Sequence, residues 1–304
     1  MSSKFTDAMG RMFDVQATVD LLQYDFVQQA LLAGAILGLL AGVIGPLVIS
    51  RQMAFSVHGT SELSLTGAAA ALIVGVSVGL GAVAGAVVAA VLFGVLGTRA
   101  RERDSVIGVV MAFGLGLAVL LLWAYDGRTG AAFSLLTGQI VAPGGTGIAL
   151  LAACAVGVIG TMLVIYRPLL FASTDPEVAA ARGVPVRALS IVFAVLVGIT
   201  AALGVQIVGA LLVMALLITP AAAAARVASG PLAATVLSVL FAEVSAVGGI
   251  LLALAPGVPV SAFITAIAFV IYLACRGIGA ARTRRGIGRG EVAPAPETAG
   301  AVTA

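Results

Sequence analysis

The sequence predicts an all-α polytopic membrane protein with about 8–9 transmembrane segments. Of its 304 residues, 61% are hydrophobic and only 10% are charged, whereas a soluble domain carries about 25% charged residues. Apolar runs of about 18 residues or more recur along the chain, and each is long enough to cross a bilayer as a helix. The net charge of +3 is modest and gives no indication of a nucleic-acid partner.

Three regions follow from the composition along the chain. Residues 1–25 form a polar N-terminal tail, residues 26–276 the membrane domain, and residues 277–304 a basic and then disordered C-terminal tail. The first tail has no central apolar stretch, so no cleavable signal peptide is expected. A short interfacial helix and a loosely ordered segment both remain open for it.

The apolar segments define the expected membrane crossings. In order they are about residues 26–50, 51–79, 80–97, 105–124, 147–166, the two halves of 188–226, 232–254 and 260–275. The stretch 188–226 is too long for one span, since about 20 residues suffice, and a break is expected at residues 204–206. Residues 126–146 are the longest interior break and suit a loop with a short helix on the membrane surface.

Arginine-rich segments set the expected orientation. Residues 99–103, 167–187 and 276–289 carry clusters of arginine and are predicted to face the cytoplasm. The turn after residue 50 then lies on the same side, and the break at 126–146 lies outside.

The most informative pair is His58, which is the only histidine, and Glu62. On a helix, a separation of four residues places both side chains on one face, about 5–6 Å apart at Cβ. Ionisable groups at membrane depth are costly and are therefore functional candidates. An imidazole and a carboxylate so placed can share a divalent metal ion. The structural alternative is a hydrogen-bonded or ion-paired couple that holds two segments together.

A short capped helix is predicted between the fifth and sixth apolar segments. Asp175 suits the N-cap, Pro176 the first helical position and Glu177 the first turn. Gly183 suits the end of this helix, and Pro185 prevents it from continuing. Such a helix has the form of a docking element, with an ordinary connecting loop as the alternative.

Four further residues are candidates for a transport path or a backbone hinge. Glu243 lies inside an apolar segment, where an acid is either a path residue or a packed, protonated carboxyl. Gly209, Thr219 and Pro220 are expected to shape the backbone, since proline kinks or ends a helix.

Three stretches carry motifs. Residues 51–67 read R-Q-M-A-F-S-V-H-G-T-S-E-L-S-L-T-G, residues 175–183 read D-P-E-V-A-A-A-R-G, and residues 208–222 read V-G-A-L-L-V-M-A-L-L-I-T-P-A-A. A shorter one, D-S-V-I-G, covers residues 104–108. Together they resemble the membrane subunit of the ABC-3 family, the zinc- and manganese-type metal ABC permeases. The resemblance covers about residues 26–276.

The chain departs from the family pattern R-R-M-A-L-I-G-D-A-L-S-H-A-A-L-P-G at three positions that matter. His58 stands where the pattern has Asp, and Glu62 stands where it has His. Thr66 replaces the usual Pro. The exchange keeps one nitrogen and one carboxylate donor at the same separation, but it leaves the metal open.

The resemblance implies the permease subunit of an ATP-driven divalent metal importer, with a type II-like ABC importer fold, in the plasma membrane. Zn²⁺ is the first expected cargo and Mn²⁺ the second, and no permanently bound cofactor is implied. The resemblance implies no catalytic activity in this chain, and without a G-x-x-x-x-G-K-[ST] loop the chain is not expected to be the ATPase itself. Two ATP-binding cassette subunits would dock on residues 175–183 and use the ATP.

The resemblance also implies further partners. A second permease copy would form a homodimer with the ion path at its interface, and an extracellular metal-binding protein would deliver the ion. Three other readings remain. An ABC permease for a metal chelate needs a wider path, and an ion-coupled secondary carrier predicts inverted repeats, of which the sequence shows no convincing case. The last alternative is a membrane scaffold that transports nothing.

Overall fold

The computed structural model describes residues 15–96, 100–125, 144–207, 209, 213–256 and 259–284. Within these ranges the chain is helical, apart from short turns. The helices are α2 (Val15–Leu21), α3 (Asp25–Ser50), α4 (Ala54–Val74), α5 (Val78–Leu96), α6 (Ala100–Trp123), α8 (Gly144–Thr174), α9 (Pro176–Ala181), α10 (Val186–Ile207), α11 (Val213–Val227), α12 (Pro231–Leu254) and α13 (Val260–Arg284). The predicted all-α fold is confirmed.

Six helices are long and apolar enough to cross a membrane: α3, α6, α8, α10, α12 and α13. Their outer surfaces carry exposed hydrophobic side chains, for example Phe113 at 71% and Trp123 at 82% exposure on α6. Large exposed apolar patches on a water-soluble protein would be unusual, so this surface suits lipid. Helix α11 has only 15 residues, which is about 22 Å of helix and less than the roughly 30 Å hydrocarbon core.

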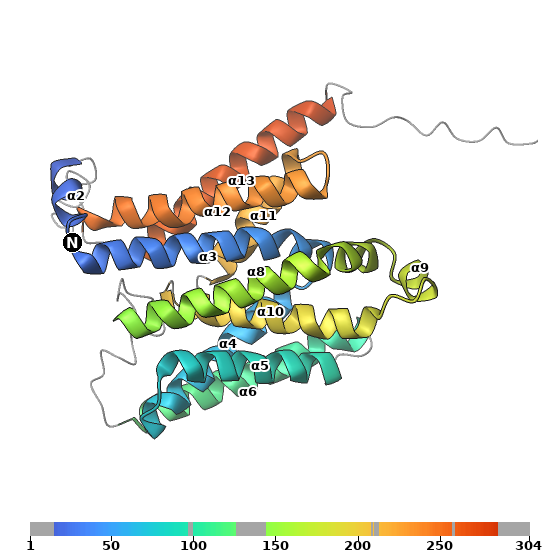
Figure 1. Cartoon of the computed structure of the whole chain (residues 1–304), viewed down its shortest axis with the longest axis horizontal. Helices are drawn as coiled ribbons and strands as arrows, with labels where there is room; N and C mark the ends of the chain where they lie inside the picture. Colours follow the sequence, from blue (N-terminus) through green and yellow to red (C-terminus); the bar gives the residue numbers. More distant parts are fainter. Residues whose placement is uncertain are drawn as a thin grey trace, which may run out of the picture.

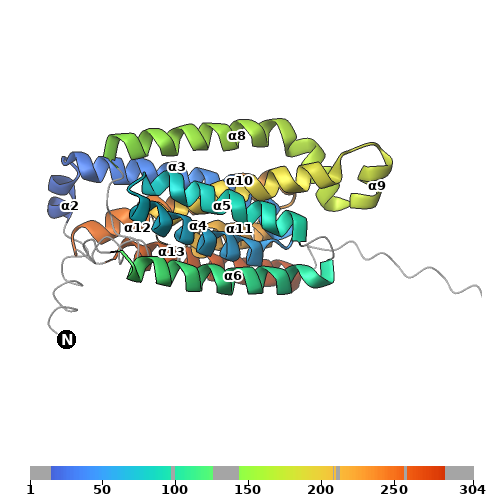
Figure 2. The ribbon, with the colours of Figure 1, turned by 90° about the horizontal axis from the view of Figure 1, so that it is seen from below.

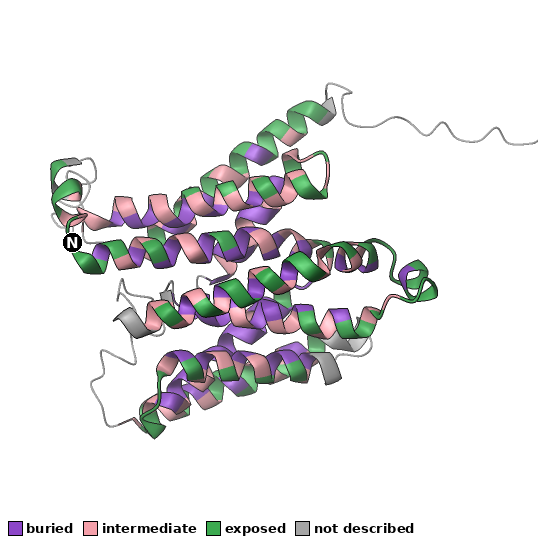
Figure 3. Ribbon diagram, in the orientation of Figure 1, coloured by how far each residue is buried: buried purple, intermediate pink, exposed green. Residues whose placement is uncertain are grey.

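Helix α3 lies at the centre of the bundle (Figure 1). It packs against α12 and α11 on one side and against α8 and α10 on the other, and α4 packs against α5, α6 and α10. Buried residues recur along α3, whereas α8 and α13 are largely exposed (Figure 3). The view in Figure 2 places α8 and α6 on opposite faces of the bundle. Buried residues recur along α4 from Ser56 to Ala71, so this helix lies inside the protein.

Glycine allows the closest contact between α3 and α12. A Cβ added to Gly42 would lie 2.7 Å from the backbone nitrogen of Val239, which real atoms do not tolerate. Small residues at such crossings let membrane helices approach closely.

The segments predicted to share one side of the membrane gather at one end of the bundle. The end of α3, helix α9, the turn between α11 and α12, and the end of α13 all lie there (Figure 1). We call this the α9 end. This arrangement agrees with the side expected from the arginines.

Two expected helix boundaries are wrong. Helix α8 continues past Pro168 to Thr174, although proline removes a backbone hydrogen bond. The fully buried Leu169 anchors the added turn, and the Ser173 hydroxyl donates to its carbonyl oxygen at 2.6 Å. The expected break within 188–226 is present but lies later than residues 204–206, because α10 continues to Ile207 and α11 begins at Val213. Gly204 lies inside α10, where an added Cβ would meet Val213 at 3.0 Å.

Other expectations concern segments that are only partly described. Helix α2 occupies the end of the expected N-terminal tail, and residues 1–14 lie outside the described residues. So do residues 126–143 of the expected external loop and the C-terminal residues 285–304. Helix α13 reaches Arg284, so the first part of the expected basic tail is helical. The three expected regions stay predictions.

Candidate metal path

The turn between α3 and α4 places the predicted metal-binding pair. Arg51 ends α3, Gln52 takes a left-handed conformation with φ of 53°, and α4 begins at Ala54. His58 and Glu62 then lie on consecutive turns of one face of α4. His58 is half-buried, and Glu62 is only 5% exposed.

Both side chains keep a buried polar atom without a partner. His58 Nδ1 and Glu62 Oε2 make no hydrogen bond to any residue that the structure describes. A buried polar atom left unsatisfied costs about 1–3 kcal/mol, and more when the group is charged. These two atoms therefore do not hydrogen-bond each other or any other described residue. A nitrogen and an oxygen donor face the same region of α4 and are available to a ligand.

Helix α4 is polar around this pair. Ser56, Thr60, Ser61 and Ser64 are all buried. Most of these hydroxyls bond within the helix: Thr60 Oγ1 donates to the Ser56 carbonyl at 2.6 Å, and Ser61 Oγ donates to the His58 carbonyl at 2.7 Å. These bonds satisfy the Thr60 and Ser61 hydroxyls without using the His58 or Glu62 side chain, whereas Ser64 Oγ has no partner among the described residues.

Thr66 links the turn of α4 that follows Glu62 to α6. Its hydroxyl lies 3.0 Å from the Glu62 carbonyl oxygen and 2.7 Å from the Gly114 carbonyl oxygen, and both contacts fit hydrogen bonds. The bond to Gly114 is one that a proline at this position cannot make. It holds the turn that follows Glu62 against a neighbouring helix.

Glu243 lies apart from the pair. It is on α12 and packs against α3, where a Cβ added to Gly38 would lie 3.2 Å from the Glu243 carboxyl. Among the described residues, no group of three His, Cys, Asp or Glu side chains is placed to hold a metal ion. Glu243 therefore does not form one set of metal ligands with His58 and Glu62 in this structure.

The three predicted backbone positions lie at and within α11. Gly209 has φ of 93°, a left-handed conformation that favours glycine, and it precedes α11. Pro220 is buried inside α11, next to the half-buried Thr219. A Cβ added to Gly45 of α3 would lie 2.5 Å from the Leu217 carbonyl oxygen, so α11 and α3 are in close contact near this proline.

The predicted capped helix is present as α9. Asp175 Oδ1 accepts a hydrogen bond from the Val178 backbone nitrogen at 2.9 Å, and Pro176 is the first helical residue. At the other end Gly183 has φ of 83°. The backbone nitrogens of Gly183 and Val184 donate to the carbonyl oxygens of Ala180 and Ala179, both at 3.0 Å. This is a Schellman motif, and α9 projects from the bundle (Figure 1).

Sequence reasoning missed one residue near the pair, Arg51. Its Nη1 donates to the Ser173 hydroxyl at 3.0 Å, and its Nη2 donates to the Ser190 hydroxyl. Its guanidinium lies 5.8 Å from the Phe193 ring centroid. Arg51 is the first residue of the motif at residues 51–67, and this position was the sequence signal that could have identified it. Its hydrogen-bond partners on α8 and α10 cannot be predicted from neighbouring residues.

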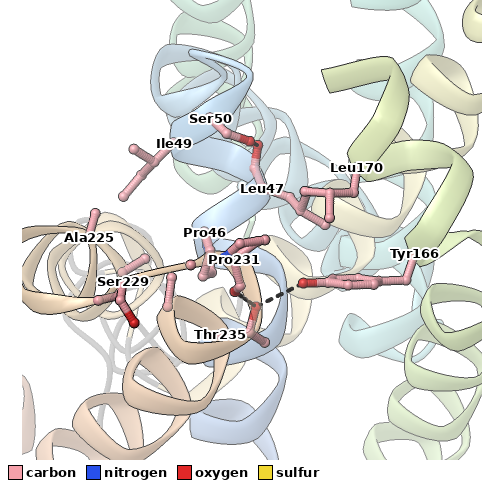
Figure 4. A pocket seen from close by; sticks show the side chains of 14 residues that line it. Pro46, Leu47, Ile49, Ser50, Tyr166, Leu170, Ala225, Ser229, Pro231 and Thr235 are labelled. Atoms are coloured by element: carbon pink, nitrogen blue, oxygen red, sulfur yellow. Dashed lines mark hydrogen bonds between the residues drawn. The ribbon is translucent and has the colours of Figure 1, made fainter. Parts of the chain in front are cut away.

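A groove of about 490 Å³ opens at the α9 end between α3, α8, α11 and α12 (Figure 4). Its lining is mainly apolar, and the Tyr166 and Thr235 hydroxyls lie 3.3 Å apart across it. None of the predicted site residues lines it, so it is separate from the metal-binding pair.

Comparison with known proteins identifies the family of the chain and its fold. The model of the ABC 3 transport family matches residues 23–277. The chain belongs to the ABC 3 transport family. A relative, the manganese transport system membrane protein MntC of Halalkalibacterium halodurans, is 31% identical over 231 residues, covering 76% of this chain and 79% of MntC. The high-affinity zinc uptake system membrane protein ZnuB of Haemophilus influenzae is 25% identical over 230 residues, or 75% and 88% of the two chains.

A solved structure agrees with this assignment. PsaBC from Streptococcus pneumoniae in complex with Fab aligns with a TM-score of 0.78 and 27% identity, covering 86% of this chain and 95% of that one. The chain is thus a multi-pass plasma-membrane permease of a manganese- or zinc-type metal ABC importer. Permease subunits of this kind are not themselves catalytic. The family and location predicted from the motifs are confirmed.

Proposed function

We propose that this permease passes a divalent first-row metal ion along α4, with His58 and Glu62 as transient ligands. The observation that carries the proposal is the pair of buried, unpartnered donor atoms, His58 Nδ1 and Glu62 Oε2, on one helix face. A conducted ion must enter favourably and still leave, which suits an incomplete donor set.

A second copy of the chain completes the donor set in this proposal. One protomer offers two donors, and the described residues hold no third His, Cys, Asp or Glu beside them. Metal sites with nitrogen and oxygen ligands commonly take four or more donors. Two protomers around a two-fold axis bring two such pairs, so the ion path lies at the homodimer interface.

Zn²⁺ and Mn²⁺ both fit the proposed pair. Imidazole suits zinc, and carboxylate suits manganese as well. MntC, at 31% identity, is named for manganese, and ZnuB, at 25%, is named for zinc. The exchange of His58 and Glu62 relative to the family pattern keeps both donor types, so selectivity is a property to be measured.

Helix α9 is the proposed docking element for the partner ATPases. It projects from the bundle, is capped at both ends, and exposes Glu177 and Val178. Two ATP-binding cassette subunits would dock on the two copies of residues 175–183 and hydrolyse ATP. An extracellular metal-binding protein would supply the ion from the opposite side.

The test is metal uptake by the complete transporter reconstituted in vesicles. We expect His58→Ala with Glu62→Ala to abolish uptake of Mn²⁺ and Zn²⁺ while assembly with the ATPase subunits is retained. Ser64→Ala is the matched control, since it also removes a buried, unpartnered polar atom on α4. Full uptake by the double variant would remove the proposed path. Uptake of a metal chelate and not of free ions would favour the alternative cargo.

A further inference from the structure

Two helices bring arginines together around one tyrosine at the α9 end. Arg226 is in the last turn of α11, and Tyr272 and Arg276 are four residues apart on α13. Arg276 Nη1 lies 3.5 Å from the Tyr272 hydroxyl oxygen, and the Arg226 side chain also lies close to this hydroxyl. A phenolic oxygen has two acceptor lone pairs, so it can take both guanidinium donors.

A third arginine fixes the position of these helices. Arg282 Nη1 donates to the Val227 carbonyl oxygen at 3.1 Å, which ties the end of α13 to the end of α11. Gly279 also lies against this end of α11, where an added Cβ would meet the Arg226 carbonyl oxygen at 3.0 Å. The three guanidiniums thus sit on a structured junction of two helices.

This cluster is positively charged, and no acid among the described residues balances it. Arg226, Arg276 and Arg282 are all exposed, and none makes an ion pair with a carboxylate in the described ranges. Like charges at short range repel each other. Each guanidinium has five N–H donors, so most donors remain available to an anion.

The same face of α13 also carries exposed apolar side chains. Phe269 is 56% exposed and Leu273 is 50% exposed, and their spacing from Tyr272 and Arg276 places all four on one side of the helix. Read toward the α9 end, this face runs from the apolar Phe269, past the Tyr272 hydroxyl with Leu273 beside it, to the Arg276 guanidinium. A phospholipid changes in the same order, from acyl chain, to glycerol ester, to phosphate.

We propose that Arg226, Tyr272 and Arg276 bind the phosphate of an anionic phospholipid in the leaflet at the α9 end, with an acyl chain along Phe269 and Leu273. Arginine suits this ligand because its planar fork matches phosphate oxygens. Basic pockets between transmembrane helices bind anionic headgroups on the cytoplasmic side. The bound lipid joins α11 to α13 and steadies the short helix that carries Thr219 and Pro220. This inference does not rest on the proposed metal ligands.

The test compares lipids on the purified, full-length transporter complex. Phosphatidylglycerol and phosphatidylcholine with the same acyl chains are added in detergent, and both the thermal unfolding temperature and the lipids retained in native mass spectrometry are measured. We expect phosphatidylglycerol to raise the unfolding temperature by about 2–4 °C more than phosphatidylcholine. Arg226→Gln with Arg276→Gln should abolish this difference and the retained lipid.

Controls separate a built site from general charge. Arg167→Gln with Arg187→Gln removes two exposed arginines at the same end and should keep the lipid effect. Equal loss in this control would overturn the proposal. Arg276→Lys keeps the charge and should still weaken lipid binding. This variant replaces the double variant as the test if the double variant does not fold. Equal protection by inorganic phosphate would show a free-anion site and overturn the lipid assignment. The proposal would also be overturned if phosphatidylglycerol had no effect on the unfolding temperature and was not retained.

Discussion

Arg51 donates a hydrogen bond from Nη1 to the hydroxyl of Ser173, which lies 122 residues later, at 3.0 Å. Its second hydrogen bond goes to Ser190 on α10, the helix that follows α9 in the chain. Arg51, seven residues before His58, therefore links the turn between α3 and α4 to α8 and α10. These two helices precede and follow α9, the proposed docking element. We therefore expect a movement of α9 toward or away from the bundle to be transmitted to the start of α4 through this side chain.

Removing the Arg51 side chain should uncouple ATP hydrolysis from transport. In Arg51→Ala both hydrogen bonds are lost, each about 1.5–3 kcal/mol for a charged donor. We expect fewer metal ions to be transported per ATP, while ATPase activity remains. Arg51→Lys should not restore coupling, because an ammonium cannot bridge both hydroxyls with a planar fork. The ratio of uptake to ATP hydrolysis is measured in vesicles, with Arg187→Gln as control. An unchanged ratio would rule out this linkage.

Restoring the family order of ligands should preserve transport. In His58→Asp with Glu62→His, one imidazole and one carboxylate remain four residues apart on α4, so the donor set is unchanged. We expect uptake close to that of the original chain, whereas His58→Asp alone, with two carboxylates, should lose most zinc uptake. Competition between Mn²⁺ and Zn²⁺ gives the selectivity. Transport failure in the double exchange, with normal assembly, would show that position as well as donor type is required.

Enlarging Gly42 should destabilise the bundle. A Cβ there would lie 2.7 Å from the Val239 nitrogen, and Val239 belongs to a helix backbone that cannot move aside. We expect Gly42→Val to cost about 1–3 kcal/mol, as overpacking does, and to lower the unfolding temperature in detergent.

Gly160→Ala is the control for this substitution, because nothing lies within 4 Å of the added Cβ. It should leave stability unchanged or raise it slightly, since glycine within a helix costs about 0.5–1 kcal/mol relative to alanine. Equal effects of the two substitutions would contradict the close contact between α3 and α12.

Removing the cap of α9 should weaken attachment of the ATPase subunits. In Asp175→Ala the bond to the Val178 backbone nitrogen is lost, at a cost of about 0.5–2 kcal/mol. Asp175→Asn keeps a capping oxygen and should behave like the original chain. Binding of the purified ATPase to the permease is measured by titration. If the two substitutions weaken binding equally, the carboxylate charge acts directly, and helix capping is not the cause.

Local patterns predicted a large part of the fold. The helices lie where the apolar segments were expected, because a bilayer requires about 20 apolar residues per span. The caps of α9 were also predictable, since Asp175, Pro176 and Gly183 act within one or two turns of the backbone. Pro168 shows where local reasoning fails. Buried contacts of Leu169 hold α8 together past a residue that usually ends a helix.

The sequence by itself determined the membrane class, the helices, the family motifs and the four-residue separation of His58 and Glu62, because each depends on neighbours along the chain. Only the tertiary structure decided that Glu243 is separate from this pair and that Arg51 reaches Ser173 and Ser190. It also decided that Arg226 meets Tyr272 between two helices. These relationships join residues far apart in sequence, and helix packing alone brings such residues together.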